Sequence, residues 1–249
     1  MKIYCSYNHK YHIFLNKVVE LVLNQYGSDL NINTLKEIEL RNIDEFEIKT
    51  DGRTVGNNKI IVTSRLYDFL PTLSIEKLRE NEDYKRLRQT IHHEMGHIND
   101  MAAMPNLYKY ASVSGHNKEQ AASQFWLEYL AEKRSVGFEG LDDDEYCMYF
   151  ASEKWECIMI SSISNFDSHN YTYLTKHLPY FLARTRDFDI REKYMCLIKN
   201  NLLKDYIFEL DIELKRLEKM YPFDDVFLLK GLLNIINKYY HKFMSTFQT

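Results

Sequence analysis

Apolar residues recur at helical spacing along much of the chain. In Tyr11 to Tyr26 they fall three or four residues apart, the period of one helix face. The same spacing predicts helices over Asn81 to Met104, Lys118 to Val136 and Asp142 to Ile163. Residues 170–249 also have a largely helical pattern. We therefore expect helices to make up most of the protein.

The stretch between the first two helices has a different pattern. Residues 29–64 contain short apolar runs, and Asp51-Gly52 and Gly56-Asn57-Asn58 are turn formers between them. This pattern predicts a small antiparallel sheet of about three strands, followed by a short helix over Ser64 to Leu70. Pro105 to Asn117, which contains Pro, Gly and two Asn, is expected to be a loop. The predicted fold class is α+β, with a mostly helical C-terminal part.

A metal-binding motif lies inside the helix predicted over Asn81 to Met104. His93-Glu94-Met95-Gly96-His97 is H-E-x-x-H, and side chains four residues apart share one helix face. Both imidazoles can therefore reach one ion, and zinc favours neutral imidazole nitrogen. Glu94 would then lie beside the metal as a base. The alternative is two ordinary histidines on a polar face. His92 points to another side and is expected to pack or to support the ligands.

A catalytic zinc site needs a third protein ligand and one open position. On the next predicted helix Glu128 and Glu132 are four residues apart and share a face with apolar residues. Burying two unpaired carboxylates there would be costly. We therefore predict that Glu128 binds zinc and that Glu132 accepts an N–H bond from His93 or His97. The alternatives are a solvated acidic face, or Glu119 as the third ligand.

These two helices resemble those of gluzincins, the metallopeptidases with an H-E-x-x-H helix and a Glu from a following helix. The resemblance covers roughly residues 55–136, and it is closest to the small intracellular ImmA/IrrE-like group. It implies a zincin-like fold, bound Zn²⁺ and a substrate held as an added strand on a sheet edge. That edge is expected at Lys59 to Ser64, with Ile60, Ile61 and Val62 as suspected substrate-binding residues. The predicted metallopeptidase core is 1–139, followed by a helical subdomain over 140–249.

Polar residues in the C-terminal part could serve the same site. Many gluzincins use a later Tyr or His to steady the oxyanion, and Tyr171, Tyr173, His177 and Tyr180 cluster there. Ordinary packing is the preferred interpretation of each one. Arg184 and Arg186 could bind a substrate carboxylate, although surface ion pairs are the simpler reading.

Composition narrows the function classes. The chain has 249 residues and a net charge of -4, which argues against a dedicated nucleic-acid binder. The N-terminus has no apolar signal segment, and no apolar run approaches the roughly 18 residues of a membrane helix. The four cysteines form no C-x-x-C pair and are expected to be reduced thiols. We therefore expect a cytoplasmic protein without a membrane partner.

The function expected from these patterns is zinc-dependent hydrolysis of peptide bonds in a protein or peptide, with Glu94 activating a water molecule. Two alternatives stay open. The same scaffold could be a metal-binding regulatory protein that binds one partner with little general proteolysis. The chain could also be a helical interaction protein without a metal. A zinc assay and digestion of casein separate the three.

Overall fold

The protein divides into two compact units, which are described separately. The computed structural model describes residues 1–6, 9–26, 29–45, 51–63, 70–112, 118–136, 144–152 and 168–247. Unit 1 comprises Met1–Ala102 and Arg134–Leu141, and unit 2 comprises Ala103–Lys133 and Asp142–Thr249. The predicted domain boundary at residue 139 lies close to Leu141, the last residue of unit 1. Residues 103–133, which were predicted to belong to the first domain, are part of unit 2.

A four-stranded mixed sheet forms the base of unit 1. The strands are β1 (Lys2–Cys5), β2 (Glu37–Arg41), β3 (Gly52–Val55) and β4 (Lys59–Thr63), in the spatial order β1-β2-β4-β3. β1 and β4 are both parallel to β2, and β3 alone runs antiparallel, to β4. Residues 29–64 contain three strands, as predicted, but β1 adds a fourth strand from outside this stretch. The predicted antiparallel direction was right for β3 and β4 and wrong for β2, which is parallel to β4. Helix α1 connects β1 to β2, because parallel neighbours need a long crossover.

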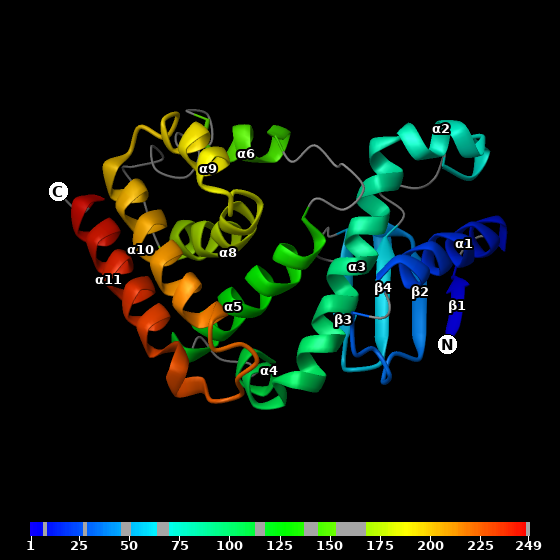
Figure 1. The fold of residues 1–249 in the computed structure, drawn as a ribbon, viewed down its shortest axis with the longest axis horizontal. Coiled ribbons are helices and arrows are strands. Elements are labelled where there is room, and N and C mark those ends of the chain that lie inside the picture. The colour runs from blue at the N-terminus through cyan, green and yellow to red at the C-terminus, as the bar shows by residue number, and fades with distance from the viewer. Residues whose placement is uncertain are drawn as a thin grey trace. The chain divides into compact units, whose positions relative to one another are not determined.

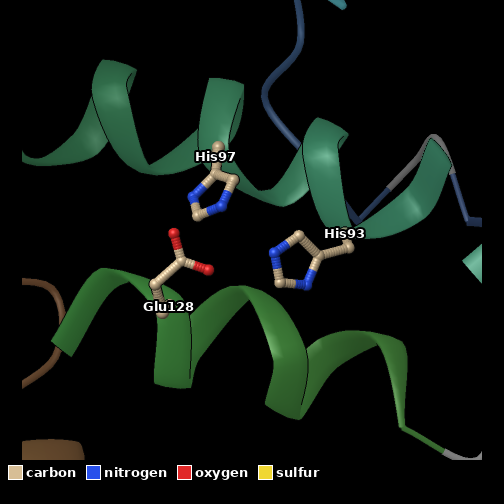
Figure 2. A group of neighbouring side chains, drawn as sticks. All are labelled: His93, His97 and Glu128. Carbon is tan, nitrogen blue, oxygen red and sulfur yellow. The ribbon is translucent and has the colours of Figure 1, made fainter. Parts of the chain in front are cut away.

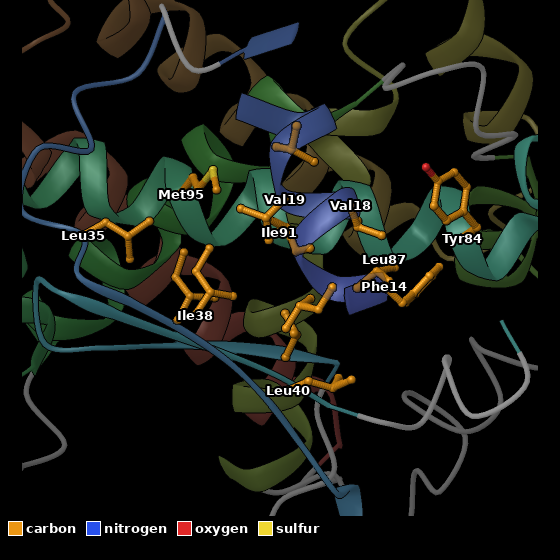
Figure 3. Close-up of a cluster of buried hydrophobic side chains, with 14 of the residues drawn as sticks. Phe14, Val18, Val19, Leu35, Ile38, Leu40, Tyr84, Leu87, Ile91 and Met95 are labelled. Carbon is orange, nitrogen blue, oxygen red and sulfur yellow. The ribbon is translucent and has the colours of Figure 1, made fainter. Parts of the chain in front are cut away.

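Two helices cover one face of this sheet and enclose the core of unit 1. They are α1 (His9–Tyr26) and α3 (Glu82–Ala103) (Figures 1 and 3). Every second residue of each strand faces these helices, because neighbouring strand residues point to opposite faces of the sheet. These buried residues are Ile38 and Leu40 of β2 and Ile60 and Val62 of β4. Opposite them, α3 buries Leu87, Ile91, Met95 and Ile98, which recur at helical spacing, whereas Ala102 is exposed.

The metal-motif helix begins at a defined cap. The Asn81 side chain accepts a hydrogen bond from the Tyr84 backbone N–H at 3.0 Å, and Glu82 and Asp83 place negative charge in the first turn. Within the described part of unit 1, the short elements are two 3-10 turns and one helix. They are η1 (Ile43–Glu45), η3 (Leu70–Thr72) and α2 (Ile75–Glu80). The helix predicted over Ser64 to Leu70 lies outside the described residues except at its end.

A buried carboxylate lies on the sheet face opposite the core. Glu39 accepts hydrogen bonds from Arg41 at 2.8 and 2.9 Å, and Lys59 lies 2.7 Å from its Oε2. Burial alone would raise the pKa of Glu39, but the hydrogen bonds from Arg41 and Lys59 outweigh it and lower the pKa to about 2. The charged form of Glu39 therefore stabilises this face of the sheet.

We expect this carboxylate to make the protein sensitive to acid. A pKa lowered from 4.5 to about 2 gives stability that is complete above about pH 4.5 and is lost as the pH falls toward 2. Between pH 7 and pH 3, wild type should lose about 2 kcal/mol more free energy of unfolding than Glu39→Gln. Urea denaturation at both pH values measures this difference. The exposed acid Glu80, changed to Gln, is the control, and an equal pH dependence of wild type and Glu39→Gln would contradict the prediction.

The secondary-structure elements of unit 2 are all helices in the residues that the structure describes. Its elements are α4 (Pro105–Ser112), α5 (Lys118–Ser135, of which Arg134 and Ser135 belong to unit 1), α6 (Asp144–Phe150), α8 (Ser168–Arg184), α9 (Phe188–Met195), α10 (Asn201–Glu218), η7 (Val226–Leu229) and α11 (Lys230–Phe247). Of the helix predicted over Asp142 to Ile163, the segment after Ser152 lies outside the described residues. In this part of the chain no helix combines the length and apolar character needed to cross a membrane.

The prediction of a loop at Pro105 to Asn117 was wrong for the first eight residues, which form α4. Proline is compatible with the first helical position, because its missing N–H has no partner there in any helix. The next two N–H groups, of Asn106 and Leu107, donate to the Asp224 carboxylate at 2.8 and 3.1 Å. A residue far along the chain thus supplies the cap that local sequence lacks.

Aromatic stacking and one buried arginine hold the later helices of unit 2 together. Tyr206 of α10 stacks on Tyr239 of α11 with ring centroids 4.6 Å apart. Arg191 of α9 donates to the Leu182 carbonyl at 3.0 Å, and it also pairs with Asp211 of α10. The Leu182 carbonyl lies in the last turn of α8, where backbone carbonyls have no partner within the helix. Arg191 therefore fixes the C-terminal end of α8.

Candidate metal site

The H-E-x-x-H residues form one buried cluster on α3. His93, Glu94 and His97 are all buried, and the two imidazole rings lie nearly perpendicular with centroids 4.8 Å apart. The helical spacing that brings them together is the one the sequence predicted. Their neighbour His92 is also buried, and burial, with smaller effects of Arg134 and His93, lowers its pKa to about 4. His92 is therefore neutral at physiological pH, which agrees with a packing role.

Strand β3 approaches α3 closely at Glu94. The Thr54 hydroxyl donates to Glu94 Oε2 at 2.7 Å and lies 3.2 Å from the Glu94 backbone oxygen. A Cβ atom at Gly52 would lie 2.5 Å from Thr90 Cγ2 and 3.1 Å from Glu94 Oε1, so a side chain there would force the neighbouring helix side chains to move. Gly52 thus allows the strand to pack closely against the helix, and Thr54 holds the carboxylate of Glu94. Neither role follows from the local sequence pattern.

The two carboxylates of α5 each have a partner on α8. Tyr180 donates its hydroxyl hydrogen to Glu128 Oε2 at 2.7 Å, and Arg184 Nε donates to Glu132 Oε1 at 2.6 Å. The Glu132 side chain is 3% exposed, so the arginine neutralises a buried charge. Arg184 is thus a partner of Glu132 that sequence analysis did not name, and the N–H bond expected from His93 or His97 stays a prediction. Arg184 is therefore part of a buried ion pair and not of a surface one.

One ligand atom from each of His93, His97 and Glu128 lies within 4.8 Å of the other two. Figure 2 shows the carboxylate of Glu128 on α5 directed toward the two imidazoles of α3. Two imidazole nitrogens and one carboxylate oxygen are a donor set that zinc binds. Bonds of about 2.0–2.2 Å in a tetrahedral site place ligand atoms roughly 3.4 Å apart. Donor atoms grouped within 4.8 Å of one another make these three residues a candidate set for a single ion.

An ion pair joins the ends of α3 and α5. Asp100, one turn after His97, accepts two hydrogen bonds of 2.7 Å from the guanidinium of Arg134 at the end of α5. The Asp100 side chain is fully buried, so this bidentate pair compensates a buried charge. It holds the last turn of α5 against α3. The sequence contains no local pattern that identifies this pair.

The strand expected to form the sheet edge is an inner strand, so that prediction was wrong. Ile60, Ile61 and Val62 lie in β4, which pairs with β2 on one side and with β3 on the other. All three side chains are buried, as a continuous apolar run in an inner strand should be. The edge strand beside Glu94 is β3, which has the more polar sequence Gly-Arg-Thr-Val.

The remaining candidate residues have different outcomes. Tyr180 contacts the site through Glu128, although packing was the preferred interpretation. His177, one turn before it, is half-buried, and burial and Lys176 lower its pKa to about 4. Arg186 is exposed. The side chains of Tyr171, Tyr173 and Glu119 lie outside the described part of the structure.

Comparison with known proteins adds no relative. No family model, curated protein or solved structure matches the chain. The chemistry of the site must therefore be argued from its own residues.

Proposed function

We propose that this protein is a zinc-dependent metallopeptidase of the gluzincin type that hydrolyses peptide bonds in a protein or peptide substrate. The observation that carries the proposal is the group of donor atoms of His93, His97 and Glu128, all within 4.8 Å of one another. Glu94 lies between the two histidines in sequence, on the helix that carries both. Three protein ligands and an adjacent acid are what catalytic zinc sites use, since they leave one coordination position for a water molecule.

In this proposal His93, His97 and Glu128 hold the ion and Glu94 moves the protons. Zinc, when bound, polarises the substrate carbonyl and lowers the pKa of water. Glu94 accepts a proton from the water whose oxygen adds to the carbonyl carbon, and then donates it to the amine as the C–N bond breaks. The Thr54 hydroxyl donates a hydrogen bond to Oε2 of Glu94. We therefore expect Oε1 to accept the proton from water.

The substrate is proposed to pair with β3. Asp51 lies opposite Thr63 in the antiparallel ladder, and the Thr63 N–H donates to the Asp51 carbonyl at 3.0 Å. Hydrogen-bonded and non-bonded pairs alternate in such a ladder, so the backbone groups of Gly52 and Thr54 point away from β4. Those groups form the outer edge of β3, beside Glu94. An extended peptide can add to this edge as a further strand, with its carbonyl near the proposed base.

Metal analysis and chelation test this proposal. The purified protein is expected to contain about one zinc ion per chain and to cleave an unstructured protein such as casein. Treatment with 1,10-phenanthroline should abolish cleavage, because removal of the ion removes the activated water, and added Zn²⁺ should restore it. Absence of any divalent ion, with undiminished stability and partner binding in chelator, would instead support a helical interaction protein.

A further inference from the structure

Helix α8 brings two side chains to the two carboxylates of α5. Glu128 and Glu132 are one helical turn apart, and so are their partners Tyr180 and Arg184. The Arg184–Glu132 pair is the more buried of the two and joins charges of opposite sign. It therefore fixes the register in which Tyr180 meets Glu128.

The bond between Tyr180 and Glu128 acts directly on the proposed third ligand. A hydroxyl donating to a carboxylate is a charge-assisted hydrogen bond, and its 2.7 Å length is typical of that class. A carboxylate has about four acceptor positions, so this bond leaves others on Glu128 for an ion. It removes most of the rotational freedom that a half-exposed glutamate otherwise has. An ion then meets a carboxylate that is already oriented.

We propose that Tyr180 is a positioning residue that holds Glu128 in its zinc-binding orientation, with Arg184 keeping α8 in register. This inference rests on the proposed function, because it requires Glu128 to be a zinc ligand. Groups that orient a metal ligand typically raise metal affinity roughly 10- to 100-fold. Tyr180 acts through Glu128 and is not assigned a contact with the reacting atoms.

The chain offers a matched control at Tyr129. Tyr129, which follows Glu128 on α5, is buried and donates its hydroxyl to Glu218 at 2.5 Å. Lys133 also pairs with Glu218, so that carboxylate keeps a partner when the Tyr129 hydroxyl is removed. Tyr129→Phe therefore removes the same kind of hydrogen bond from the same unit without touching a proposed ligand.

The test is a zinc titration of the apoprotein against a competing chelator. Tyr180→Phe is expected to weaken zinc binding roughly 10- to 100-fold, whereas Tyr129→Phe leaves it unchanged. Thermal unfolding of the two apoproteins shows whether a general loss of stability explains the difference. In a Glu128→Ala background, Tyr180→Phe should have no further effect on zinc affinity, because the group it orients is gone.

Each result has a definite meaning. Wild type that binds no zinc overturns the proposed function and this inference together. Wild type that binds zinc with the same affinity as Tyr180→Phe overturns only the inference. The inference is also overturned if Tyr180→Phe weakens zinc binding by the same factor in the wild-type and Glu128→Ala backgrounds. The tyrosine would then affect zinc binding without acting through Glu128.

Discussion

Glu94→Gln is expected to lower kcat/KM for cleavage of an unstructured protein by roughly 10²–10⁴-fold while zinc content stays the same. Glutamine has the size of glutamate and can still accept the hydrogen bond from Thr54, so the contact between β3 and α3 is retained. It has no carboxylate to accept a proton from water. Cleavage rates and bound zinc measured on the same preparations separate loss of the base from loss of the ion.

The control for this change lies on the same helix. Glu82 is an exposed acid in the first turn of α3, and Glu82→Gln makes the same chemical change away from the proposed site. It should leave cleavage within about twofold of wild type, since surface substitutions usually have small effects. Equal activity of Glu94→Gln and wild type would remove the proposed mechanism. Zinc-loaded wild type that cleaves no test protein would favour a metal-binding regulator.

The shared face of the two histidines on α3 could be predicted because its geometry is local. Two histidines four residues apart in a helix share a face whatever the rest of the chain does. The choice of Glu128 needed one further step, the cost of burying an unpaired carboxylate on an apolar helix face. That cost applies equally to Glu132, and it implies a partner for this carboxylate without indicating that the partner is Arg184.

The contacts that orient the site depend on tertiary structure. Thr54 is forty residues from Glu94, and nothing in the pattern of either segment indicates that they meet. Gly52 looks like an ordinary turn residue next to Asp51, yet its lack of a side chain is required where β3 packs on α3. The hydrogen bond from Tyr180 to Glu128 could be recognised only once α8 was known to lie beside α5. Periodicity identifies which residues share a face but not which faces pair.

The sheet illustrates the same limit. Ile60, Ile61 and Val62 form a continuous apolar run, and such a run is typical of an inner strand covered on both faces. The resemblance to gluzincins drew attention to this strand as an edge, although its own composition favoured the interior. The polar strand β3 was the better edge candidate on physical grounds. Strand direction could not be read from the pattern, because parallel and antiparallel pairs of short apolar runs look alike.

Glu128→Ala is expected to weaken zinc binding by more than about 100-fold, because even partners outside the ligand set cost roughly 10- to 100-fold. The change removes one of the three proposed ligands and leaves two imidazoles. It should not unfold the protein, since Glu128 is half-exposed and alanine is the strongest helix former. Competition with a chelator measures the affinity, and circular dichroism of the apoprotein shows whether α5 is still helical.

Gln124→Ala is the matched control, because Gln124 is exposed and lies one turn before Glu128 on the same helix. Its zinc affinity should equal that of wild type. Glu128→His supplies an imidazole in place of the carboxylate and should recover part of the affinity, since zinc accepts both kinds of ligand. Zinc binding that survives Glu128→Ala unchanged would show that the third ligand is a different residue. The peptidase proposal would then need another acid or imidazole at this position, because two histidines alone do not make a catalytic zinc site.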